Sequence, residues 1–339
     1  MIEWHVVDAW TTTESRVGGV YTALALFGGF AAPLFLFLAG VAIPFAAASH
    51  QRRSKLPAGS LESVRAAAWA LQKRGWQVVL IAHLLRLHSF LWNLWGRFDS
   101  VFKPDILNIL GLGMVVTAWC WGRSGATARR IAWLLVPAAI VVLLTPVSRD
   151  WWWPTLLHVR FEAYIRPNGW GQFALFPWVA FVFVGAAVGE WIAQPRPAEA
   201  ERRFHGQLAL GGAAIIIAGI VAYFVPPPFR PSDFWTTSAS YFLIRVGGMT
   251  MALSGAWLWM SRRRADRWSP VVLFGQTSLF VYLVHLELAY GLFSAAWKRS
   301  LTIPEAAIGY VGLTVLMVLL ARWWVGRTAR PWIPTHLRA

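Results

Sequence analysis

The residues best suited to chemistry in this chain lie inside apolar stretches, where polar side chains are costly and are therefore candidates for function. The stretch 270–293 carries three of them. At about 100° per residue of helix, Ser278, Tyr282 and His285 fall within roughly a 60° wedge. One narrow face therefore offers a hydroxyl, a phenol and an imidazole. Glu287 lies on the opposite face, which favours a structural role.

A second polar face is predicted for the stretch 75–94, where His83, Arg86 and Asn93 follow i, i+3, i+10 spacing. For His83 and Arg86, a hydrogen-bonded structural cluster between helices and a substrate-binding face are both consistent with this pattern. His88 points elsewhere, and we expect it to be structural.

Further polar residues are expected at a similar depth, toward the outer side of the membrane. They are His5, Asp8, Asp105, Asn108 and Arg245, with His285 at the same level. Asp105 follows Pro104, so it has a simpler structural alternative as a helix cap. Convergence of these groups at one depth nevertheless predicts an outward-facing polar site.

The residue types at this depth indicate acid–base chemistry. A histidine beside a carboxylate or amide is the usual general base for a sugar hydroxyl or amine, and an arginine can hold a phosphate or a developing oxyanion. The sequence contains no nucleophilic Ser or Cys motif, no glycine-rich phosphate loop and no metal-ligand motif. Direct transfer is therefore favoured over a covalent intermediate, without a metal.

Long apolar helices must position these residues. The chain is 57% hydrophobic and 14% charged, against about 25% charged in ordinary soluble domains. Continuous rather than alternating apolar runs predict an all-α polytopic membrane protein and argue against a β-barrel. About nine transmembrane helices are visible, at 24–48, 75–94, 105–121, 130–147, 172–191, 207–225, 238–260, 271–294 and 305–325.

The net charge of +16 would suggest nucleic acid in a soluble protein. Here the basic residues cluster in short loops between apolar runs, which indicates orientation in a lipid bilayer and no nucleic-acid partner. The C-terminus is predicted to be cytoplasmic. Residues 1–10 read like the end of a helix whose beginning is missing, which would make ten helices. We expect a single domain over 1–339: a first-helix remnant and outer loop (1–23), a bundle (24–325) and a basic tail (326–339).

Four segments resemble motifs of a known family. FGQTSLFVYLVHLELAYGLF resembles an LG-x-x-SL-x-x-YL-x-H helix, and AAPLFLFLAGVAIPF a P-x-F-x-F-x-x-G helix. KPDILNILGLGMV is similar to a D-x-L-x-x-I-G helix, and QFALFPWVAFVFVGAAVGEW to a PW-x-x-x-x-x-G-x-x-x-G helix. In this order they resemble the bacterial transmembrane acyltransferases related to heparan-α-glucosaminide N-acetyltransferase.

This resemblance implies transfer of an acyl group, such as acetyl, from cytosolic acetyl-CoA or another acyl-CoA to a sugar or glycan across the bacterial inner membrane. By position it implies catalytic roles for His5, Asp105 and His285, to which we add Asp8. Substrate or cofactor contacts are expected from His83, Arg86, Asn93, Asn108, Arg245, Tyr282 and Ser278.

The chain departs from the family pattern near its start. The basic D-x-x-RG entry to the first helix is absent, and residues 11–32 contain no counterpart of the family's loop histidine. Either His5 takes the role of base, or the protein no longer acetylates glucosamine.

Other functions stay open on the sequence. A transporter or carrier of a polar substrate would use Arg86, His83 and Arg245 along its path, and an accessory subunit would have lost catalysis. The tryptophan-rich loop 148–171 is read either as an interfacial aromatic belt or as a wall of an outward pocket. A dimer is compatible with the sequence.

Overall fold

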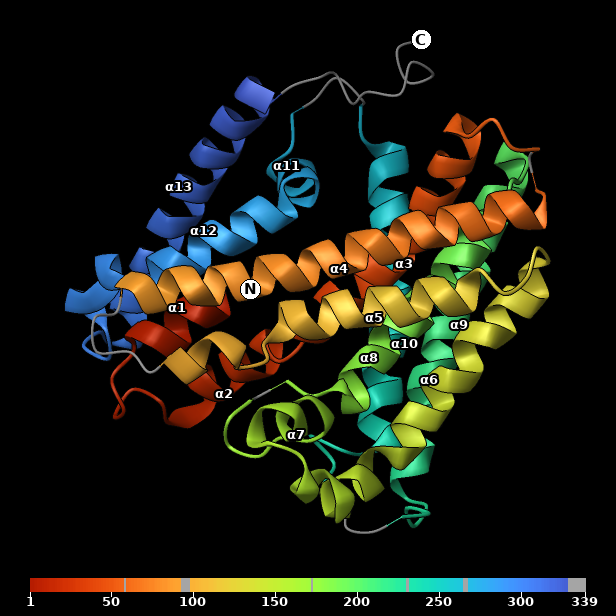
Figure 1. Cartoon of the computed structure of the whole chain (residues 1–339). Helices are drawn as coiled ribbons and strands as arrows, with labels where there is room; N and C mark the ends of the chain where they lie inside the picture. The colour runs from red at the N-terminus through yellow and green to blue at the C-terminus, as the bar shows by residue number, and fades with distance from the viewer. Residues whose placement is uncertain (58, 93–97, 172, 230–231, 265–267, 329–339) are drawn as a thin grey trace. The chain divides into compact units, whose positions relative to one another are not determined.

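The computed structural model describes residues 1–57, 59–92, 98–171, 173–229, 232–264 and 268–328. Within these ranges the chain is helical, with no strand beyond one isolated bridge between Thr11 and Leu301. It divides into two compact units, one formed by residues 32–262 and the other by residues 1–31 with 263–339 (Figure 1). The all-α architecture predicted from the apolar runs is confirmed.

The larger unit holds the central helices of the chain, and its α9 and α10 run side by side (Figure 1). Its elements are α3 (Ala31–Arg53), α4 (Leu61–Trp92), η1 (Phe98–Phe102), α5 (Ile106–Trp121), α6 (Thr127–Asp150), η2 (Trp153–Leu156), α7 (Val159–Ile165), α8 (Leu175–Ile192), α9 (Ala198–Tyr223) and α10 (Ala239–Arg262).

Helical segments lie over every predicted span. Among the described residues, six segments are long and apolar enough to cross a membrane, or seven if a bent pair forms one span. The predicted spans 75–94 and 238–260 are not in this count. They correspond to α4 and α10, whose apolar runs contain polar residues such as Arg86 and Arg245. Residues 61–74, which precede the predicted span 75–94, are helical and continuous with it, because α4 runs unbroken from Leu61 to Trp92.

A close backbone approach brings α4 and α5 together. A Cβ atom added to Gly75 would lie 2.7 Å from the carbonyl oxygen of Gly111, and one added to Gly111 would lie 2.7 Å from that of Gly75. Glycine is therefore required at both positions for the two helices to pack this closely. The contact holds the α4 face that carries Arg86 against the beginning of α5.

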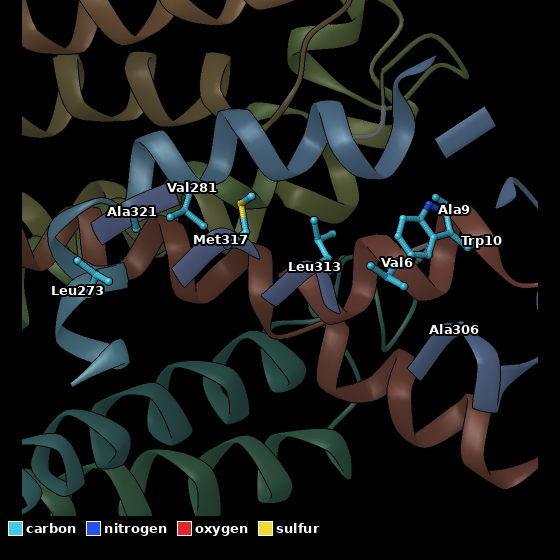
Figure 2. Close-up of a cluster of buried hydrophobic side chains, with 9 residues drawn as sticks. All are labelled: Val6, Ala9, Trp10, Leu273, Val281, Ala306, Leu313, Met317 and Ala321. Carbon is cyan, nitrogen blue, oxygen red and sulfur yellow. The ribbon is translucent and has the colours of Figure 1, made fainter. Parts of the chain in front are cut away.

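The smaller unit places the N-terminal helix against the C-terminal part of the chain. Its elements are α1 (Ile2–Trp10), α2 (Gly18–Gly28), α11 (Pro270–Gln276), α12 (Ser278–Tyr290), η3 (Leu292–Trp297) and α13 (Ile303–Thr328). One face of α1 buries Val6, Ala9 and Trp10 in an apolar cluster with side chains of α11, α12 and α13 (Figure 2). Because i, i+3 and i+4 share a helix face, His5 and Asp8 fall on another side of α1.

The predicted continuous helix over 271–294 is wrong, because the chain bends by 94° between α11 and α12. The break lies at Thr277, whose backbone leaves the helical region and whose hydroxyl donates to the carbonyl of Leu273 at 2.8 Å. Serine and threonine hydroxyls often bend helices through such bonds. Ser278, Tyr282 and His285 all lie after the bend, so their common helical register survives.

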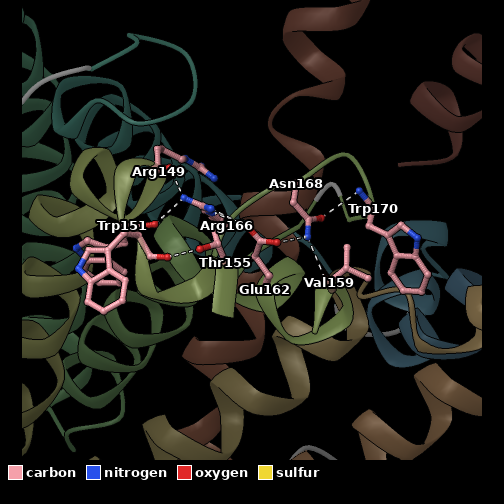
Figure 3. A network of polar contacts seen from close by, with 9 residues as sticks. Arg149, Trp151, Thr155, Val159, Glu162, Arg166, Asn168 and Trp170 are labelled. Atoms are coloured by element: carbon pink, nitrogen blue, oxygen red, sulfur yellow. Dashed lines mark hydrogen bonds and ion pairs between the residues drawn. The ribbon is translucent and has the colours of Figure 1, made fainter. Parts of the chain in front are cut away.

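The segment between α6 and α8 is held by a polar network (Figure 3). Arg166 donates to the Glu162 carboxylate from Nη2 at 2.7 Å and from Nε at 2.9 Å, and to the carbonyls of Arg149 and Trp151, each at 2.8 Å. One arginine therefore joins α7 to the end of α6.

This network should make stability depend on pH. The hydrogen bonds from Arg166, and then that from Asn168, hold the pKa of Glu162 below its ordinary value of 4.5. A carboxylate with a lowered folded-state pKa stabilises the fold above its unfolded pKa, and this contribution is lost as pH falls through the folded value. Glu162→Gln should lower the free energy of unfolding near neutrality by about 0.5–1 kcal/mol.

Thermal unfolding of both proteins in detergent across the acidic range checks this expectation. The difference in thermal midpoint between the wild type and Glu162→Gln should narrow as pH falls below 4.5. The exposed residue Glu199 provides a matched control, Glu199→Gln, with no such trend. A difference that stays constant with pH would contradict the assignment.

Candidate active site

Hydrogen bonds fix the end of α1 against the end of α12 and against the segment that precedes α13. Trp10 Nε1 donates to the carbonyl of Ala289 at 2.9 Å, and the amides of Ser300 and Leu301 donate to the carbonyl of Trp10 at 3.0 and 2.9 Å. Trp10 is also 4% exposed. These bonds therefore hold the polar residues of α1 beside the C-terminal end of α12.

At this junction a chain of hydrogen bonds runs from a carboxylate to an imidazole. The Tyr290 hydroxyl donates to Asp8 Oδ2 at 2.7 Å, and His5 Nδ1 lies 3.1 Å from the same hydroxyl. Arg16 Nη1 lies 3.8 Å from Asp8 Oδ1, and Arg16 Nη2 donates to the Asp8 carbonyl. The guanidinium of Arg16 therefore holds both the side chain and the backbone carbonyl of Asp8.

These partners determine the tautomer of His5. A phenol has one proton, and Tyr290 gives it to Asp8, so its oxygen can only accept from His5. The proton of neutral His5 must then be on Nδ1, which leaves the lone pair on Nε2. A carboxylate that orients a base through an intermediate group is the arrangement that general-base catalysis needs.

His285 lies beside His5 with the same tautomer. Its Nδ1 is 2.6 Å from the carbonyl of Val281, which can only accept, so Nδ1 carries the proton. His285 is 1% exposed, and its Nε2 is buried with no hydrogen-bond partner among the described residues. The two imidazole centroids are 5.2 Å apart, and the Tyr282 ring meets His285 edge-on at 5.7 Å.

The pair can therefore act as one proton acceptor at a time. Two imidazolium ions at this distance in a buried position would repel each other strongly, so protonation of one ring disfavours protonation of the other. The arrangement provides one base, at His5 Nε2, and one neighbouring lone pair, at His285 Nε2. Such a site can accept the proton of an amine or of a hydroxyl at His5 Nε2.

The larger unit brings together a second group of predicted residues, and it gives Asp105 the helix-cap role. Asp105 Oδ1 accepts from the amides of Leu107 at 2.9 Å and Asn108 at 3.3 Å, while Asn108 Oδ1 accepts from the Asp105 amide at 3.1 Å. This is a capping box at the start of α5. The other oxygen, Oδ2, lies 3.5 Å from Arg86 Nε.

His83 completes this second group. Its Nδ1 donates to the carbonyl of Val79 at 2.8 Å and lies 3.3 Å from Asn108 Nδ2. The carbonyl needs a donor, so the longer contact to the amide nitrogen is packing rather than a hydrogen bond. Tyr164 of α7 also lies in this region, where burial, followed by the negative charge of Asp105, raises its pKa to about 12.

Two further predicted site residues, Ser278 and Arg245, have other surroundings. Ser278 is exposed at the first turn of α12. The guanidinium of Arg245 lies over the Tyr241 ring on α10, 3.8 Å from its centroid. Asn93 is outside the described residues.

Sequence reasoning missed Tyr290 and Arg16. Tyr290 is off the face defined by Ser278, Tyr282 and His285, since five residues of helix after His285 turn it by about 140°. Its position as a phenol at the end of the same stretch was the available signal. Arg16 gave no signal, because a single arginine in a short loop is also typical of membrane orientation.

Comparison with known proteins identifies a family for most of the chain. The family model for the catalytic region of heparan-alpha-glucosaminide N-acetyltransferase matches residues 1–219. No curated protein and no solved structure matches the chain. The matched range includes α1 with His5 and Asp8, and it also includes Arg86 and Asp105.

Proposed function

The chain belongs to the heparan-α-glucosaminide N-acetyltransferase catalytic family, and we propose that it acetylates a sugar or glycan at the outer side of a bacterial inner membrane. The donor is cytosolic acetyl-CoA or another acyl-CoA, and the C-terminus is cytoplasmic. The observation that carries this proposal is the Asp8–Tyr290–His5 chain, which leaves His5 Nε2 unprotonated. Membership of the family supplies the reaction class.

In the proposed reaction, His5 Nε2 removes a proton from the acceptor amine or hydroxyl. The acceptor nitrogen or oxygen forms a bond to the acyl carbonyl carbon, and the bond from that carbon to the CoA sulfur breaks. The proton held on His5 then passes to the departing thiolate, which leaves as CoA. No covalent enzyme intermediate is needed, because base and acceptor act directly on the thioester.

Asp8 and Tyr290 support this step without touching the substrate. When His5 takes up a proton, its Nδ1–H remains bonded to Tyr290, and the Asp8 carboxylate stabilises the positive charge through the phenol. His285 lies beside His5, with the two ring centroids 5.2 Å apart, and positions the base for this step.

The remaining predicted residues have proposed roles in substrate contact. Arg86 and Arg245 are the cations suited to anionic groups of the acyl donor. Asp105 acts through Arg86, because its oxygens are engaged by the α5 cap and by that guanidinium. Further contacts with the substrate or the acyl donor are proposed for His83, Asn93, Asn108, Tyr282 and Ser278.

Release of free CoA by the purified protein tests the proposed function. Protein in detergent is given acetyl-CoA with glucosamine or an envelope glycan, and thiol formation is followed over time. Acceptor-dependent release is the expected result. Uptake of substrate into reconstituted vesicles without CoA release would instead identify a carrier, and absence of both activities would identify an accessory protein.

Tyr290→Phe should lower the rate of CoA release about 10- to 100-fold. The phenol links a charged carboxylate to the base, and a hydrogen bond to a charged group contributes about 1.5–3 kcal/mol, where each 1.4 kcal/mol is tenfold in rate. Tyr223→Phe, at an exposed tyrosine of α9, is the matched control. A wild-type rate for Tyr290→Phe would show that the phenol does not serve the base.

A further inference from the structure

Large apolar side chains project from the segment between α6 and α8. The exposed fractions are 72% for Trp152, 74% for Leu156 and 65% for Phe161. Because α6 and α8 are both long and apolar enough to cross a membrane, the segment that joins them lies at a membrane surface. Exposed apolar groups at that level need a partner other than water.

The polar side chains of Glu162, Arg166 and Asn168 in the same segment are hydrogen-bonded to one another (Figure 3). Asn168 Nδ2 donates to the carbonyl of Val159 at 2.9 Å and to Glu162 Oε2 at 3.3 Å, and Asn168 Oδ1 accepts from the amide of Trp170 at 3.1 Å. Glu162 is also bound by Arg166. These groups are occupied in holding the fold of the segment, so they are not free to bind a glycan.

A further contact fixes the segment in the larger unit. Arg160 forms an ion pair with Asp99 of η1, and its guanidinium lies over the Phe102 ring, 4.9 Å from the centroid. Together with the bonds from Arg166 to the end of α6, this contact makes η2 and α7 a supported platform rather than a free loop. Most of the side chains that the platform exposes are apolar, and Thr155 and His158 are the polar exceptions.

We propose that residues 152–161 form an interfacial anchor that inserts Trp152, Leu156 and Phe161 into the lipid leaflet at that surface. Tryptophan is enriched at the boundary between headgroups and acyl chains, where its ring is apolar and its N–H stays hydrated. Leu156 and Phe161 extend the contact into the acyl region. The anchor sets the depth at which α6 ends and α8 begins.

Spin-label accessibility tests the anchor. The chain has one cysteine, Cys120, so Cys120→Ala provides a background for Leu156→Cys and Phe161→Cys. Each variant is labelled with a nitroxide and reconstituted into phosphatidylcholine–phosphatidylglycerol vesicles. Collisions with oxygen, which concentrates in lipid, are compared with collisions with a water-soluble nickel chelate. Glu199→Cys, at an exposed acidic residue in the first turn of α9, is the matched control.

At Leu156→Cys and Phe161→Cys, the nitroxide should collide more often with oxygen than with the nickel chelate. At Glu199→Cys, collisions with the nickel chelate should be the more frequent. Preferential collision with the nickel chelate at both test sites would overturn the proposal, because the segment would then be in water. Low accessibility to both reagents, with spin–spin broadening between labels, would also overturn it, since a second copy of the chain would cover the segment.

Discussion

Replacement of His5 by alanine should lower the rate of acceptor-dependent CoA release by about 10²–10⁴-fold, the usual contribution of a general base. The reason is the fixed tautomer: Tyr290 accepts from Nδ1 and donates to Asp8, so His5 presents its lone pair on Nε2. His5→Gln should give a similar loss, since its side-chain carbonyl can accept a hydrogen bond but cannot take up a proton at neutral pH.

Two controls separate a catalytic loss from unfolding. His88→Ala, at an exposed histidine of α4, should keep the wild-type rate, and the thermal midpoint of His5→Gln should stay close to that of the wild type. His285→Ala should lower the rate less than His5→Ala, because His285 Nδ1 is tied only to the neutral carbonyl of Val281. Wild-type rates in both histidine variants would show that the active site is elsewhere.

The largest expected effect on stability is at Arg130. Arg130 Nη1 lies 3.0 Å from Glu190 Oε1, and Trp121 Nε1 donates to the other carboxylate oxygen at 2.7 Å. Glu190 is 2% exposed. Removal of the cation would leave a buried carboxylate without its charge partner, so Arg130→Met should lower the free energy of unfolding by about 3–5 kcal/mol.

A double-variant cycle separates the ion pair from packing. Glu190→Gln removes the charge but keeps an acceptor for Trp121, so Arg130→Met combined with Glu190→Gln should be more stable than Arg130→Met alone. Arg129→Met, at the exposed neighbour, should change stability by less than about 0.5 kcal/mol. Denaturation in mixed detergent micelles measures the four proteins of the cycle and the Arg129→Met control, and additive losses within the cycle would contradict the coupling.

Local sequence patterns predicted several features that the structure confirms. Continuous apolar runs predicted the helices, because a backbone in lipid must satisfy its own hydrogen bonds. The helix cap was the structural alternative for Asp105 after Pro104, and the structure shows this cap, whose geometry involves only neighbouring residues. Helical spacing predicted that Tyr282 and His285 share a face, and both are buried on α12. The ordered motifs predicted the family that the match confirms.

Other features depended on the approach of distant segments. Tyr290 and Asp8 are 282 positions apart, and Arg130 and Glu190 are 60 apart. Periodicity gives the face on which a side chain lies, but it does not give the partner that packs against that face. From the sequence, Arg130 therefore indicated only the orientation of the chain in the membrane. In the structure it pairs with the buried carboxylate of Glu190.

The sequence by itself determined that this protein is a helical membrane protein, and it marked His5, Asp8 and His285 as candidates for acid–base chemistry. The tertiary structure alone decided which nitrogen of each histidine holds the lone pair, because the tautomer depends on the atom that faces Nδ1. It also decided the bend at Thr277, whose backbone leaves the helical region within a stretch that apolar composition alone would continue.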